Sequence, residues 1–269
     1  MLRLPGWWHE LASPEFRALD TEATVALLPV GAIEQHGPHL PVAVDTCLVD
    51  AVARRALELL PLGTPVLVLP TTAVGKSNEH VDFPGTLTLS AETLGRVWYE
   101  MGASVRRTGL RKILLFNGHG GQPQVMQIVA RELRIDHDML AVAANWFSWG
   151  LPDGLFAPAE IRHGIHAGAV ETSMMLAVRP DLVDMAAAAD FVPVTVADDL
   201  DYPRLRALGA AGLGWQTQDL HGSGACGDAT IATAEAGRAV IEHAAGRLAE
   251  LLQELVRFPL QRLRERPGA

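Results

Sequence analysis

Cysteine is scarce in this chain. The two that are present, Cys47 and Cys226, give no disulfide framework and no zinc-finger spacing, so we interpret both as packing residues. No stretch approaches the roughly 18 uninterrupted apolar residues that a membrane span needs. The first ten residues also lack the long apolar segment of a signal peptide. These absences predict a cytoplasmic protein without a membrane partner.

Basic residues are few as well. The chain has 22 lysines and arginines against 31 aspartates and glutamates, which gives a net charge of −9. Nucleic-acid-binding proteins normally display a basic face, so we expect no nucleic-acid partner. The basic residues gather at 106–112 and 257–266, and we interpret both groups as solvated ends of structural elements. Apolar residues make up 49% of the chain, which is enough for a substantial core.

Short apolar runs alternate with helical patterns along the sequence. Alternation at this spacing indicates βαβ units and a parallel sheet. We therefore predict an α/β fold, a three-layer sandwich in which helices cover both faces of a mostly parallel sheet. No repeat or linker interrupts the chain, so residues 1–269 are predicted to form one domain. The expected strands are 24–30, 65–69, 112–116 and 139–144, and the expected helices are 13–20 (capped by Ser13), 47–60, 90–107 (capped by Ser90), 123–135, 166–178 and 228–258.

Ligand-type side chains concentrate in the stretch from Val30 to Thr46. Within twelve residues it carries Glu34, His36, His39 and Asp45, directly after an apolar run. Two glycines and two prolines predict a rigid, irregular turn rather than a helix. Carboxylates and imidazoles are ligands for divalent metals such as zinc or manganese. Polar loop residues are more often simply solvated, so this stretch alone leaves both interpretations open.

Other polar loops follow the later strands, at 75–86, 117–121 and 145–166. Right-handed crossovers place all strand-to-helix loops at one edge of a parallel sheet, so these loops are expected to be neighbours. His119 stands between glycines, which allow close approach of the backbone to a ligand. The ligand-type residues that converge in this arrangement are Glu34, His36, Asp45, His119, His166 and Glu171.

A mixed carboxylate and imidazole set of this size fits two divalent ions about 3.5–4 Å apart, bridged by one carboxylate and a hydroxide. Metal binding lowers the pKa of such a bridging water from about 15.7 towards roughly 7, which creates a nucleophile at neutral pH. The residues therefore predict hydrolysis.

The motifs resemble those of the creatininase (creatinine amidohydrolase) family. Residues 31–41, Gly-Ala-Ile-Glu-Gln-His-Gly-Pro-His-Leu-Pro, followed by Asp45 and Thr46, are similar to the first signature of this family. Its other motifs are matched in order over about residues 24–245, by Phe-Pro-Gly-Thr-Leu-Thr-Leu (83–89), Asn-Gly-His-Gly-Gly (117–121), His-Ala-Gly-Ala-Val-Glu-Thr-Ser (166–173), Gly-Ala-Cys-Gly-Asp-Ala (224–229) and Ala-Thr-Ala-Glu-Ala-Gly (232–237).

The resemblance implies a three-layer α/β fold, a binuclear metal site, hydrolysis of cyclic or linear amide C–N bonds and a homohexamer. Carried over by motif, Glu34, His36, Asp45 and His119 are metal ligands, with Asp45 as the bridge. His166 is the group that transfers a proton or polarises the carbonyl.

The chain departs from the family pattern after His119. Family members that act on creatinine have a Tyr-Glu pair there, whose glutamate is a ligand, whereas this chain has Gly120 and Gly121. Glu171 is therefore the candidate for the missing ligand. Other members with the Gly-Gly form are deformylases or peptidase-like enzymes of cofactor maturation, so the identity of the amide stays open.

Two further groups of residues have a functional and a structural interpretation. Trp146 and Trp149 lie in a connection rich in glycine and proline, and either form a lid that stacks on a flat substrate or anchor the loop or a subunit interface. His80 and Glu79 either hydrogen-bond to the ligands or belong to a plain surface loop, and Asn78 and His80 are also candidates for contact with the substrate.

We predict a metal-dependent amidohydrolase with two divalent ions per chain (zinc, manganese or iron), in which His166 and Glu171 are catalytic. The predicted substrate is a small non-peptide amide, such as a creatinine-like compound or a formamide. A non-catalytic metal- or ligand-binding protein on the same scaffold and a peptidase-like enzyme of cofactor maturation are the alternatives.

Overall fold

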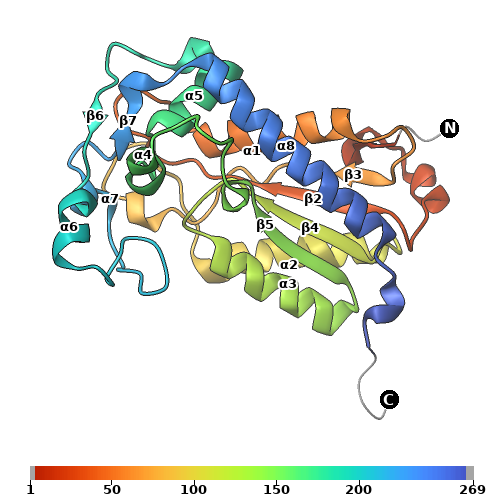
Figure 1. The fold of residues 1–269 in the computed structure, drawn as a ribbon. Coiled ribbons are helices and arrows are strands. Elements are labelled where there is room, and N and C mark those ends of the chain that lie inside the picture. Colours follow the sequence, from red (N-terminus) through yellow and green to blue (C-terminus); the bar gives the residue numbers. More distant parts are fainter. Residues whose placement is uncertain (1–3, 265–269) are drawn as a thin grey trace.

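The computed structural model describes residues 4–264 (Figure 1). At its centre is a five-stranded sheet with the strand order β1-β3-β2-β4-β5, in which all neighbours are parallel. This confirms the predicted α/β fold with a parallel sheet. The strand β1 was not predicted, because two residues carry no periodic pattern. The strands are β1 (Gly6–Trp7), β2 (Val25–Val30), β3 (Val66–Val68), β4 (Lys112–Asn117) and β5 (Leu140–Asn145).

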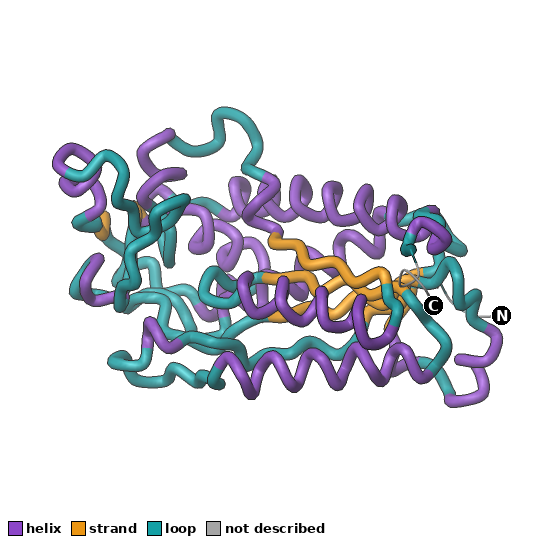
Figure 2. The backbone as a smooth tube through the Cα atoms, turned by 90° about the horizontal axis from the view of Figure 1, so that it is seen from below, coloured by secondary structure: helices purple, strands orange, loops and turns teal. Residues whose placement is uncertain are grey.

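Helices lie on both faces of the sheet (Figures 1 and 2). The central strands β2 and β4 are buried along their whole length, as expected for strands with both faces covered. Alternate residues point to opposite sides: Leu27 packs in the core beneath α1 and α8, whereas Leu28 packs in the core with α2 and α3. These helices are α1 (Val44–Leu59), α5 (Ala169–Val178) and α8 (Ala234–Arg257) on one face, and α2 (Ala91–Arg107) and α3 (Pro123–His137) on the other.

The stretch from about 190 to 228, which the sequence patterns leave unassigned, forms short elements. Strands β6 (Asp190–Phe191) and β7 (Gly227–Asp228) pair in a small antiparallel sheet. The remaining helices are α4 (Pro158–His163), α6 (Thr195–Asp201) and α7 (Thr217–Leu220), with 3-10 turns at Trp8–Glu10, Ser13–Ala18, Asn78–His80, Trp146–Trp149, Pro180–Leu182, Ala229–Ile231 and Leu260–Arg262.

Two of the helix boundaries that were predicted wrongly bear on the ligands. The helix after β2 begins at Val44, so Asp45 lies in its first turn instead of in the loop. A carboxylate is favoured there by the positive end of the helix dipole. The helix predicted at 166–178 begins only at Ala169, because the backbone of Gly168 is extended. His166 therefore precedes the helix, and its carbonyl accepts a hydrogen bond from Cys226 N at 2.8 Å.

The predicted caps had mixed outcomes. Ser90 caps α2 as expected, because its hydroxyl accepts a hydrogen bond from Thr93 N at 3.2 Å. Ser13 does not cap a helix, since it is the first residue of a 3-10 turn. The last helix begins at Ala234 and not at 228. The Thr233 hydroxyl caps it by accepting a hydrogen bond from Ala236 N.

Lys112 links the start of β4 to the end of α8. Its ammonium group donates hydrogen bonds to the carbonyls of Leu255, Val256 and Phe258 at 2.8, 2.8 and 2.9 Å. Only 1% of Lys112 is exposed, so its assignment to a solvated basic group was wrong. The contact satisfies carbonyls that have no partner at a helix C-terminus. In the part of the chain described, no helix is both long and apolar enough to cross a membrane.

Candidate metal centre

Side chains from four loops meet beyond the carboxyl ends of β2 and β4. Glu34 Oε1 lies 3.2 Å from His119 Nδ1, 3.3 Å from His80 Nε2 and 3.8 Å from His166 Nδ1. Each of these four side chains is buried, and they come from the loops at 31–46, 117–121, 75–86 and 145–166. The loops that the parallel sheet was expected to bring together therefore do meet.

The ligand-type atoms include two groups that share Asp45. One group is formed by Glu34, Asp45 and His119, and the other by His36, Asp45 and Glu171, with the ligand atoms of each group within 4.8 Å of one another. The two oxygens of Asp45 are divided between them. Oδ1 lies 3.6 Å from His36 Nε2, and Oδ2 lies 3.4 Å from His119 Nδ1. Asp45 is therefore the carboxylate common to both groups.

Several of these atoms are buried without a hydrogen bond. Within residues 4–264, Glu34 Oε2, His36 Nε2 and Asp45 Oδ2 have no hydrogen-bonding partner. Buried polar atoms are almost always hydrogen-bonded, so three unpaired ones in a single cluster require another partner. Their chemistry, two carboxylate oxygens and one imidazole nitrogen, matches the ligands of zinc or manganese. The residues present therefore fit divalent ions.

Backbone carbonyls fix which nitrogen of each histidine faces the centre. His36 Nδ1–H donates to Glu34 O at 3.0 Å, which leaves Nε2 for the cluster. His119 Nε2–H donates to Lys76 O at 2.9 Å, which leaves Nδ1 facing Glu34 and Asp45. Hydrogen bonds of this kind set the tautomer and the ring orientation of a metal-binding histidine.

The charges of the centre are strongly coupled. Burial disfavours the charged ring of His36, but Asp45 and Glu171 outweigh this effect and raise its pKa to about 9. Burial likewise opposes the charge on His119, yet Glu34 and Asp45 raise its pKa well above the ordinary value. Burial raises the pKa of Glu171 to about 7. Without a metal ion, the protonated rings of His36 and His119 therefore balance the negative charge of the carboxylates, and a metal ion would displace these protons.

His166 lies beside the cluster as a neutral group. Its Nε2–H donates to Gln35 O at 2.8 Å, so Nδ1 faces Glu34. Burial, together with the neighbouring His36 and His80, holds the pKa of His166 well below the ordinary value. A neutral imidazole with a free nitrogen can accept a proton.

His80 also contacts Glu34 and is buried. Gln35 Nε2 donates to His80 Nδ1 at 2.7 Å, which leaves Nε2–H for Glu34 Oε1. This geometry matches the hydrogen-bonding interpretation of the loop at 75–86, since His80 orients a ligand-type carboxylate. Asn78 is exposed and lines the cavity described next.

A cavity of about 500 Å³ opens onto the cluster. Trp215 lines it, from the glycine-rich segment Gly212-Leu-Gly-Trp, whereas Trp146 is buried in the core and Trp149 stacks on Phe116 with ring centroids 5.7 Å apart. Neither Trp146 nor Trp149 is among the residues that line this cavity. Sequence reasoning missed Trp215, although a tryptophan after closely spaced glycines is a usable signal for a loop that covers a site.

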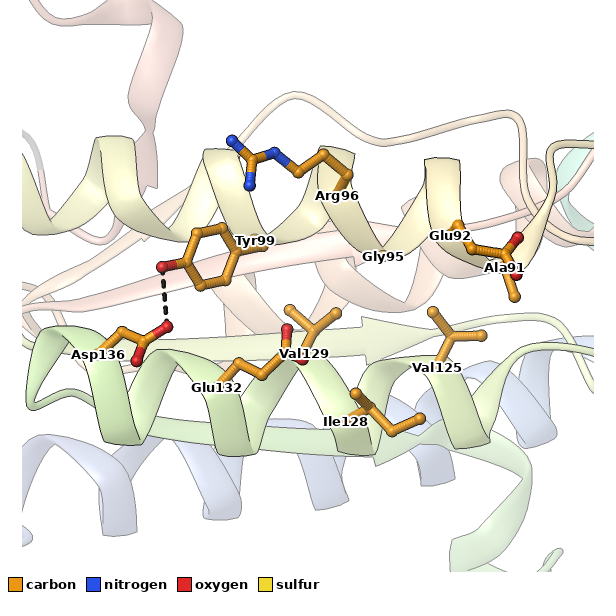
Figure 3. Close-up of a pocket in the computed structure, with 10 residues that line it drawn as sticks. All are labelled: Ala91, Glu92, Gly95, Arg96, Tyr99, Val125, Ile128, Val129, Glu132 and Asp136. Atoms are coloured by element: carbon orange, nitrogen blue, oxygen red, sulfur yellow. Dashed lines mark hydrogen bonds between the residues drawn. The ribbon is translucent and has the colours of Figure 1, made fainter.

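A hollow of about 570 Å³ lies apart from this centre, between α2 and α3 (Figure 3). Tyr99 donates a hydrogen bond to Asp136 across it at 3.0 Å. None of the possible metal-binding groups found among the described residues includes a residue that lines it. Among the described residues, the hollow therefore has no cluster of possible metal ligands like the one beyond β2 and β4.

Gly121, at which the chain departs from the Tyr-Glu pattern, is closely surrounded by other atoms. A Cβ atom at this position would lie 2.0 Å from Glu79 Oε1 and 2.6 Å from His119 Nε2. Contacts this short do not occur in proteins, so this loop conformation has no room for a side chain at 121. Glu171 reaches the cluster from another element, with its Oε2 3.8 Å from His36 Nε2.

Glu160 is a buried residue that sequence reasoning missed. Its carboxylate accepts hydrogen bonds from Ala169 N at 2.7 Å and Asp228 N at 2.9 Å. It lies so close to Gly164 and Gly168 that a Cβ atom at either would come within 2.5 Å of Glu160 Oε1. A single glutamate on a short helix gives no local signal of this role.

Several known proteins are similar to this chain in sequence. A family model described as "Creatininase: Creatinine amidohydrolase" matches residues 9–252. The mycofactocin precursor peptide peptidase of Mycolicibacterium smegmatis is 32% identical over 234 residues, which cover 86% of this chain and 85% of that protein. The creatinine amidohydrolase of Pseudomonas putida is 35% identical over 191 residues, or 64% of this chain and 70% of that protein.

Solved structures show the same fold. The structure "Creatininase Mn" matches with a TM-score of 0.75 and 26% identity, covering 94% of this chain and 99% of that one. A mutant creatininase of the Zn-Zn type matches with a TM-score of 0.73 and 26% identity, covering 94% and 98%. The shared motifs, the fold and the family model agree, and the chain belongs to the creatininase family of hydrolases.

Proposed function

We propose that this protein is a metal-dependent amidohydrolase that uses two divalent ions to hydrolyse an amide C–N bond. The observation that carries the proposal is the Asp45 carboxylate, whose two oxygens face two separate ligand groups. When bound, two such ions supply a polarising charge for the substrate carbonyl and lower the pKa of the water between them. Zinc, manganese and iron all suit this mixed set of nitrogen and oxygen ligands.

The ligand assignment follows the two groups. Glu34, Asp45 and His119 would hold one ion, and His36, Asp45 and Glu171 would hold the other. The lack of space for a side chain at Gly121 supports Glu171 as the replacement for the family's missing glutamate.

His166 is the proposed proton-transfer group. Its anchored Nε2–H and free Nδ1 allow it to take a proton on the side of the cluster and to pass it to the leaving nitrogen. Glu171, with a pKa of about 7, is a second group that exchanges a proton near neutrality in the absence of a cation. The nearly complete ligand set speaks against the non-catalytic binding protein.

The substrate is proposed as a small amide, either a non-peptide compound or a short peptide-like one. The second class is favoured by the size of the cavity, about 500 Å³, and by an adjoining hollow of about 300 Å³. The two hollows share Ile165, Ala207 and Leu208 in their walls, so an elongated molecule can extend from one towards the other. The relative named as a precursor peptide peptidase supports the same class.

The test begins with the metal content of the purified protein. It continues with an amide-hydrolysis screen on metal-loaded and chelator-treated samples, using creatinine, formamides and short peptides. About two ions per chain and chelator-sensitive turnover are expected. Full metal content in Glu34→Gln with an unchanged rate contradicts the assignment, as does a metal-loaded protein without turnover on any amide. The proposed homohexamer is tested separately by light scattering.

A further inference from the structure

We infer that Lys76 binds a carboxylate of the substrate, so that the amide cleaved at this centre belongs to an anionic molecule. The inference rests on the proposed function, because it names the substrate class of the same site. A carboxylate close to the scissile bond occurs on the amine side in the C-terminal residue of a peptide, and on the acyl side in a dicarboxylic acid monoamide.

Lysine is rare in this chain. Of the 22 basic residues, only Lys76 and Lys112 are lysines. Lys112 is buried and engaged with the end of α8, far along β4 from the cluster. Lys76 lies on the wall of the cavity beside the ligand-type residues. A lysine ammonium is a compact charge on a flexible stem, which suits a single carboxylate in a confined space.

The backbone of Lys76 is tied to the metal centre. Its carbonyl accepts the hydrogen bond from His119 Nε2–H, and its N–H donates to Gln122 Oε1 at 3.2 Å. The adjacent Gly75 allows this close approach, since a Cβ atom there would lie 2.3 Å from Gln122 Oε1. Because the backbone of Lys76 contacts His119 and its side chain lines the same cavity as the cluster, the ammonium is available to a charged group of a molecule bound there.

Within residues 4–264, no carboxylate forms an ion pair with the Lys76 ammonium. The polar contact of its Nζ among the described residues is with the neutral amide oxygen Asn78 Oδ1. The nearby carboxylates face histidines instead: Glu79 Oε1 lies 3.5 Å from His119 Nε2, and Glu34 faces three imidazoles. A carboxylate from the substrate would give this ammonium a charge-assisted hydrogen bond.

Paired substrates test the inference on the metal-loaded protein. One pair is N-acetyl-alanyl-alanine and its C-terminal amide, and the other is succinamic acid and butyramide. The acid is expected to exceed its neutral partner in kcat/KM by about tenfold, chiefly through KM, for the pair with the carboxylate on the correct side. In Lys76→Met this ratio is expected to fall towards one, and Lys76→Arg, which keeps the charge, is expected to restore part of it.

Chemical labelling gives a second readout that does not depend on turnover. Because Lys112 is buried, Lys76 is the side-chain amine open to acetylation, and mass spectrometry follows its modification. The preferred acid is expected to slow acetylation of Lys76 about tenfold more than its neutral partner does at equal concentration.

The outcomes separate this inference from the proposed function. In one outcome, the acid and its neutral partner have equal kcat/KM in both pairs, and Lys76→Met does not change this ratio. That result contradicts the role of Lys76 and leaves the hydrolase proposal intact. Preference for the acid that persists in Lys76→Met also overturns it. Absence of turnover on every amide tested contradicts the proposed function, while ligand-independent acetylation of Lys76 contradicts the inference by itself.

Discussion

The carboxylate of Glu160 accepts a hydrogen bond from the backbone N–H of Ala169 at 2.7 Å. Ala169 is the first residue of α5, and Glu171 follows two residues later in the first turn of the same helix. The second oxygen of Glu160 holds Asp228 N in β7. A residue outside both ligand groups thus fixes the segment on which His166 and Glu171 depend.

Replacing Glu160 by glutamine tests this connection. The amide keeps the size of the side chain but turns one acceptor into a donor, which then faces a backbone N–H. We expect a loss of about 1–3 kcal/mol in the free energy of unfolding, measured with urea. The kcat/KM of the metal-loaded enzyme is expected to fall about tenfold to hundredfold as the ligand segment shifts. The exposed Glu132→Gln is the control, and equal behaviour of the two variants contradicts the prediction.

Metal content should distinguish the bridge from the terminal ligands. Asp45→Asn removes a charge that both groups share, so both ions are expected to be lost or greatly weakened. Glu171→Gln affects only the group with His36, so about one ion per chain is expected to remain. Elemental analysis after dialysis measures the ratio. Retention of both ions in Asp45→Asn excludes the bridging assignment.

Metal binding should depend on pH through His36. In the protein without metal, burial opposes its charge, yet Asp45 and Glu171 raise its pKa from 6.5 to about 9. A metal must displace this proton, so apparent affinity is expected to fall by about tenfold for each pH unit below 9. Titrations between pH 6.5 and 9, with proton release followed in weak buffer, measure the effect. Affinity that is constant over this range contradicts it.

The same shift affects the stability of the metal-free protein. Because the folded-state pKa of His36 is raised, its contribution is fully present below pH 6.5 and is lost as pH rises through about 9. In urea unfolding of chelator-treated protein, the part of the free energy of unfolding that His36 contributes is therefore expected to decrease between pH 6.5 and about 9. The metal-free His36→Gln variant should lack this component of the pH dependence.

Gly121 and Gly120 form a matched pair. A Cβ atom at Gly121 would collide with Glu79 and His119, whereas one at Gly120 would meet nothing within 4 Å. Gly121→Ala is expected to lower metal affinity about tenfold to hundredfold by displacing His119, and Gly120→Ala is expected to change it little. Calorimetric metal titration measures both. Equal affinities in the two variants contradict the close-contact explanation.

Lys112→Met should destabilise the fold without altering the metal centre. The substitution leaves three carbonyls at the end of α8 without their donor. A decrease of about 2–3 kcal/mol in the free energy of unfolding is expected, with metal content unchanged. The exposed Arg131→Met is the control. Loss of metal in Lys112→Met would show that the two ends of β4 are coupled.

Local sequence patterns predict the alternation of strands and helices, the cap at Ser90, and the presence of Glu34, His36 and His119 in the loops after β2 and β4. These features are local, because periodicity and capping depend on residues a few positions apart. The parallel arrangement then follows from handedness rules, which is why the convergence of the loops was predictable.

Which single polar residues become buried depends on how distant segments pack in three dimensions. Lys112 and Glu160 have no distinguishing neighbours in the sequence, and their partners lie 143 and 9 or 68 residues away. The same holds for Trp215, which lines the cavity while Trp146 lies in the core. Burial of a polar group depends on packing and hydrogen bonds between distant segments, and no local pattern encodes that.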